Sequence, residues 1–63
     1  MADKLLTQAK TLWKSQLQVR KDAEELVKLS ASNPDIDKLA KLMLDNARLA
    51  LLQAQKFVEK LGG

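Results

Sequence analysis

Apolar residues recur every three or four positions along both halves of the chain, which is the period of a helix that buries one side. Residues 3–30 contain neither Gly nor Pro and are expected to form one helix. Further along, Asn33 suits a helix N-cap and Pro34 suits the first helical position. We therefore predict a first helix over about 3–30, a turn over about 31–33 and a second helix over about 34–61.

The a and d positions of a seven-residue repeat run unbroken through both predicted helices. They are Ala2, Leu5, Ala9, Leu12, Gln16, Val19, Ala23, Leu26 and Ser30 in the first helix, and Ile36, Ala40, Met43, Ala47, Ala50, Ala54, Phe57 and Leu61 in the second. When the chain folds back at Asn33, most layers join a large residue to a small one, as in Ala9 with Phe57. This alternation favours close packing. It predicts an all-α fold, an antiparallel helical hairpin of coiled-coil type that forms one domain over residues 1–63.

The e positions of the repeat carry a second set of large apolar residues. These are Leu6, Trp13, Val27, Leu44, Leu51 and Val58. Equivalent positions of an antiparallel pair flank the same side of its seam, so a lone hairpin would expose all six. The chain has only 63 residues and no Cys for a disulfide, so a second chain is a natural source of further stability. We therefore expect these residues to form a self-association interface, giving a homodimeric four-helix bundle or a higher oligomer.

Four further leucines of the second helix lie outside this repeat pattern. They are Leu39, Leu42, Leu49 and Leu52. At 100° per residue, the first three line the flank opposite the e positions and the last falls on the outer surface. Three interpretations stay open: scattered surface leucines, an oligomer interface beyond the dimer, or a surface that binds another helical protein.

A row of lysines marks the outer face of the first helix. Lys10, Lys14, Lys21 and Lys28 fall within about 40° of one another at 100° per residue. One interpretation is a stripe that binds RNA or another polyanion. The other is a solvated face, which is favoured because no aromatic residue lies within the stripe to stack on bases. The net charge of +3 is too small to indicate nucleic-acid binding by itself.

Three other residues have roles that the repeat suggests. Trp13 is interpreted as an anchor of the core or of the interface between chains. Gln16 either fixes the register of the core or reaches solvent past the opposite helix. Arg20 interrupts the e positions and is expected to form an ion pair, with Asp45 or with Asp37 of a second chain.

The chain offers little for catalysis, because it has no His, Cys or Tyr and no Gly-rich phosphate loop. Its neighbouring carboxylates are explained by helix capping and charge pairing, so we expect no enzyme activity, cofactor or metal. No apolar run approaches the roughly 20 residues that cross a bilayer, so we expect a cytoplasmic protein without a membrane span.

The sequence therefore favours a structural or protein-interaction module whose partner is another copy of itself. Two alternatives are polyanion binding by the lysine stripe and a hairpin subunit or adaptor that binds another helical protein. The regular periodicity also suits a designed helical bundle.

Overall fold

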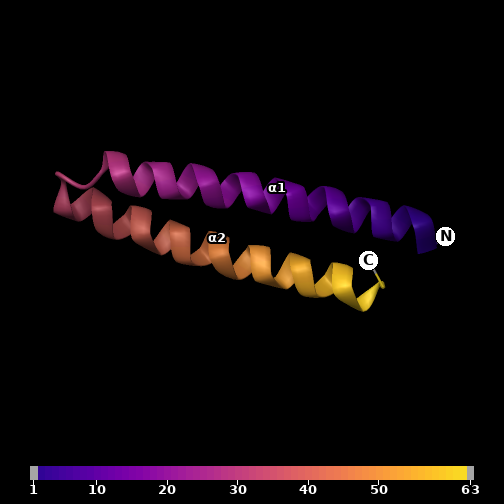
Figure 1. Ribbon diagram of the computed structural model, residues 1–63. Coiled ribbons are helices and arrows are strands. Elements are labelled where there is room, and N and C mark those ends of the chain that lie inside the picture. Colours follow the sequence, from indigo (N-terminus) through magenta and orange to yellow (C-terminus); the bar gives the residue numbers. More distant parts are fainter. Residues whose placement is uncertain (1, 63) are drawn as a thin grey trace.

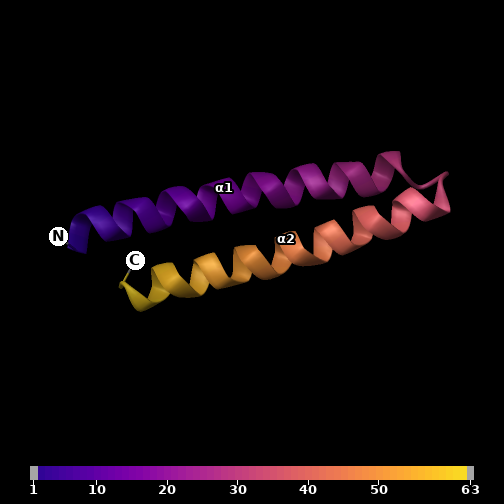
Figure 2. The same cartoon turned by 180° about the vertical axis from the view of Figure 1, so that it is seen from behind.

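The computed structural model describes residues 2–62, with side chains from residue 3, and it consists of two helices. Helix α1 spans Ala2–Leu29 and helix α2 spans Pro34–Lys60. The helices lie side by side and antiparallel, in a molecule that measures 48 × 14 × 12 Å (Figure 1). Figure 2 shows from behind that both chain ends lie at the end opposite the turn. The predicted antiparallel helical hairpin is confirmed, and each helix end lies within one residue of its expected position.

The turn between the helices is stabilised by hydrogen bonds and by the N-cap that the sequence predicts. The backbone N–H of Asn33 donates to the carbonyl oxygen of Ser30 over 3.0 Å. The side chain of Asn33, the N-cap of α2, accepts a hydrogen bond from the backbone N–H of Ile36 at 3.5 Å. Pro34 occupies the first helical position, where its missing N–H is harmless, and Asp35 places negative charge at the positive end of the helix dipole. The predicted start of the second helix is therefore confirmed.

The seam between α1 and α2 is formed by the a and e positions of the repeat. The buried or half-buried residues at these positions are Leu6, Ala9, Trp13, Gln16, Arg20, Ala23 and Val27 on α1, Ser30 just after it, Asp37, Ala40, Leu44, Ala47, Leu51, Ala54 and Val58 on α2, and Leu61 just after that helix. In the middle of the seam Ala23, Leu44 and Ala47 form one buried cluster, against which Val27 packs. Large and small residues therefore alternate along the seam, as expected, although the large ones come from the e positions and not from the d positions.

The prediction that d positions fill the seam is wrong. The large d residues are 45–54% exposed, including Met43 and Phe57, which were expected to pack in layers with Ala23 and Ala9. They flank the seam instead of filling it. The physical reason is that the a positions are mostly alanine and have large residues on both sides, so that the helices can close over either side but not over both.

The core that a single hairpin buries is small. Its buried residues are Ala9, Ala23, Ala40, Leu44, Ala47, Ala54 and Val58, and none of the side chains in residues 3–62 is completely buried. Five of these seven residues are alanines, whose methyl groups remove little apolar area from water, at about 0.8 kcal/mol per buried carbon. Such a core offsets only part of the conformational entropy that a chain of this length loses on folding.

Candidate interaction surface

The six e-position residues that were expected to form a self-association interface lie in the seam of the hairpin. Leu44 and Val58 are buried between the helices, and Leu6, Trp13, Val27 and Leu51 are half-buried. The expectation that a single hairpin exposes these side chains is therefore wrong. Since the helices close over the e positions, the large side chains on the other flank of the seam are left exposed.

The exposed apolar surface consists of the large d residues of both helices. We call it the open apolar face, and it comprises Leu5, Leu12, Val19, Leu26, Ile36, Met43 and Phe57. Spacings of seven residues, or of fourteen between Met43 and Phe57 with the small Ala50 between them, keep each set in one row along its helix. Equivalent rows of an antiparallel pair lie on the same side of the seam. The two rows therefore form one continuous surface along the hairpin, and about half of each side chain is exposed.

Near the turn, the open apolar face is hollowed into a shallow groove between the helices. The groove has a volume of about 550 Å³, and its lining includes Leu26 and Leu29 from α1 and Ile36, Leu39 and Met43 from α2. Side chains of both helices thus line one depression, which places the two rows on the same face. An apolar depression of this kind suits the insertion of apolar side chains from a partner.

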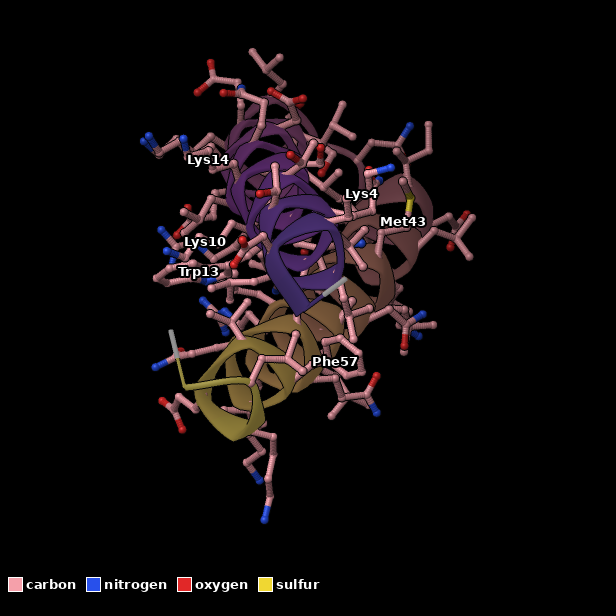
Figure 3. All side chains as sticks on the ribbon, turned by 90° about the vertical axis from the view of Figure 1, so that its right-hand side faces the viewer. Lys4, Lys10, Trp13, Lys14, Met43 and Phe57 are labelled. Atoms are coloured by element: carbon pink, nitrogen blue, oxygen red, sulfur yellow. The ribbon has the colours of Figure 1, made fainter. Side chains whose placement is uncertain are left out.

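The view along the hairpin from the end with both termini separates the two flanks (Figure 3). Met43 and Phe57 point to one side, and Lys10 and Trp13 point to the other. The open apolar face and the flank that carries Trp13 are therefore opposite sides of the molecule.

The four leucines considered as a partner surface are all exposed but do not lie together. Leu39 lines the groove next to the open apolar face. Leu52 lines a different depression, which Arg20 and Arg48 border with their charged side chains. Leu42 and Leu49 lie in the row between those of Leu39 and Leu52, on the outer side of α2. These leucines are thus divided between three parts of the α2 surface.

The four residues of the lysine stripe, Lys10, Lys14, Lys21 and Lys28, are exposed along α1. Lys28 lies in the last turn of this helix, where a positive charge interacts favourably with the helix dipole. Figure 3 places the half-buried Trp13 on the same side as Lys10 and Lys14, within about one helical turn of both. An aromatic ring therefore borders the stripe, although none lies within it.

Ion pairs within the hairpin lie on the side of the seam that carries the e positions. The Nε of Arg20 lies 3.7 Å from Oε1 of Glu24 and not within ion-pair distance of Asp45, so the predicted pair with Asp45 is wrong. The alternative, Asp37 of a second chain, stays a prediction. The Nζ of Lys41 lies 2.9 Å from Oδ2 of Asp37. This hydrogen bond is the main reason that the pKa of Lys41 is raised, and the negative charge of the carboxylate is the second. Both pairs join residues one turn apart on the same helix and are partly exposed, so each contributes little stability.

The structure adds two findings about other kinds of site. Within residues 2–62, the side chains of Asp and Glu form no group of three that could hold a metal ion. Over the same range, neither helix has an apolar stretch long enough to cross a membrane.

No family model matches the chain, and no curated protein or solved structure is significantly similar to it. The open apolar face is therefore the most distinctive surface that the geometry offers.

Proposed function

We propose that the protein is a structural or interaction module whose hairpin self-associates through the open apolar face into a four-helix bundle. The observation that carries this proposal is a contrast between the exposed face and the buried core. Large side chains, including Leu26, Met43 and Phe57, are half exposed on one continuous face, whereas most of the buried core is alanine. A face of this kind on a small chain marks an interaction site.

Burial of this face offsets much or all of the free-energy cost of bringing two chains together. Covering the exposed half of one Leu, Ile, Met or Phe side chain contributes about 1 kcal/mol. With the whole face of each of two copies covered, the total is on the order of 10–15 kcal/mol. This total is comparable to the roughly 4–15 kcal/mol that association costs in lost translational and rotational freedom. Self-association therefore supplies the apolar burial that the hairpin core lacks.

We expect the midpoint temperature of unfolding to rise with protein concentration. Two folded chains share one bundle, so mass action favours the folded state as the concentration increases. A tenfold increase corresponds to about 1.4 kcal/mol per bundle, or a shift of about 5 °C for a bundle of this size. Thermal unfolding followed by far-ultraviolet circular dichroism measures this shift. A midpoint that stays constant over a hundredfold range of concentration would contradict the proposal.

A second candidate function is polyanion binding by the lysine stripe, and the position of Trp13 favours it. The ring lies on the same side as Lys10 and Lys14, where it could stack on a base while the ammonium groups contact phosphates. On this hypothesis a structured RNA binds at low salt, and Lys14→Glu weakens binding and lowers its salt dependence. Lys38→Glu is the matched control, because Lys38 is an exposed lysine on the other helix. Absence of binding at low salt, or equal binding by both variants, excludes this candidate.

A further inference from the structure

The margins of the open apolar face carry charges that are separated by sign along the hairpin. The next rows outward from the seam hold six charged residues. The basic end, near the chain termini, has Lys4, Lys56 and Lys60, and the acidic end, near the turn, has Asp22, Glu25 and Asp35. Between these two groups the same rows hold uncharged residues such as Gln8, Ser15 and Asn46. Figure 3 shows Lys4 on the same side as Met43 and Phe57.

The helix dipole accounts for Asp35 and Lys60, which lie in the first and last turns of α2, but not for the charges at the ends of α1. Lys4 lies in the first turn of α1, where a positive charge opposes the helix dipole, and Glu25 lies near its other end, where a negative charge does the same. Among the residues that the structure describes, ion pairs join Arg20 to Glu24 and Lys41 to Asp37, and neither pair includes a charge of the basic or the acidic end. In a single hairpin, like charges therefore lie together at each end of the face without an ion pair to an opposite charge in the described part of the chain, although Asp22 accepts a hydrogen bond from Gln18 at 2.9 Å.

A second copy can dock its open apolar face onto that of the first in two twofold-symmetric arrangements. If the two hairpins are antiparallel, each helix lies over the same helix of the other copy, and the turn of one copy lies at the open end of the other. If they are parallel, α1 lies over α2 of the other copy and both turns lie at the same end. The antiparallel arrangement brings each basic end to an acidic end on both margins, whereas the parallel arrangement brings like charges together.

We propose that the occupant of the open apolar face is a second copy of this chain, docked antiparallel so that the basic end of each copy meets the acidic end of the other. This inference rests on the proposed self-association and adds its orientation. The apolar rows provide the buried area, while the charged margins select one of the two orientations and disfavour the other.

Distances between spin labels on two single-cysteine variants test the orientation, because the chain has no Cys of its own. Gln8→Cys places a label near the open end of α1, and Gln18→Cys places one near its middle. Both positions are exposed and uncharged and lie at the margin of the same helix, so each variant is the control for the other. In an antiparallel dimer the labels at position 8 are separated along the 48 Å hairpin, by about 30 Å at 1.5 Å per residue, while the labels at position 18 are close together.

Double electron–electron resonance measures these distances between chains. A long distance at position 8 with a short one at position 18 is the expected result. Distances of similar length at both positions, each spanning the diagonal of the bundle, indicate a parallel dimer, which overturns the orientation but leaves the self-association in place. If neither variant gives a distance between chains at concentrations of tens to hundreds of micromolar, the second copy is absent and both proposals fail.

Discussion

Replacing Met43 with Lys is expected to dissociate the dimer by placing a charge in the open apolar face, at the groove near the turn. In the proposed bundle the side chain at this position is covered by the second copy, and burying an unpaired ammonium group costs several kcal/mol. Since both copies carry the change, we expect the dimer dissociation constant to rise at least 100-fold, which corresponds to about 3 kcal/mol. Sedimentation equilibrium at a concentration where the unmodified chain is dimeric measures this change.

The matched control for this prediction is Leu52→Lys. Leu52 is 46% exposed and Met43 is 53% exposed, but Leu52 lines a depression on another part of the surface, away from the open apolar face. The control variant should therefore keep the mass of the unmodified chain. If both variants remain dimeric, or if Leu52→Lys dissociates the chain as strongly as Met43→Lys, the open apolar face is not the interface.

The second large effect is expected inside the seam, where Leu44→Ala removes the largest of the seven buried side chains. Leu44 packs with Ala23 and Ala47, and small neighbours of this kind have little side chain with which to fill the space left behind. Substitutions of this type cost about 2–5 kcal/mol, and we expect a loss of about 3 kcal/mol in the free energy of unfolding. Urea unfolding of both proteins at one fixed concentration measures it.

Leu42→Ala provides the comparison for the seam prediction, because Leu42 is 59% exposed on the same helix. This change should alter the free energy of unfolding by about 0.5 kcal/mol or less, as surface substitutions usually do. Equal losses at the two positions would mean that α2 is rotated relative to the seam described above.

The helices and the turn could be predicted from the sequence because their signals are local. Asn33 and Pro34 mark a helix start through their own backbone and side-chain chemistry, whatever the rest of the chain does. The repeat of apolar residues likewise requires each helix to bury a row of alanines. These features determine an antiparallel hairpin once the turn is short.

Which flank the helices close over could not be predicted in the same way, because this choice depends on packing between helices. Large residues lie on both sides of the alanine row, so that Ala23 has Leu26 on one side and Val27 on the other. Either flank alternates large with small residues across the seam, and either satisfies the packing rule. The pairing of large with small residues was therefore insufficient evidence that the d positions fill the seam.

One signal in the sequence could have favoured the observed seam. The row just outside the e positions is charged along much of its length, with Lys10, Glu24, Lys41 and Arg48, which suits a solvated edge. The row just outside the d positions is uncharged through the middle of the hairpin. A large apolar surface with such a border is better suited to docking than to solvent, so comparing the two borders would have identified the open apolar face.

Sedimentation equilibrium of the unmodified protein determines whether a second copy of the chain covers the open apolar face. We expect twice the mass of one chain at concentrations of tens of micromolar, with dissociation on dilution. A folded, helical protein that keeps the mass of a single chain throughout this range would contradict it.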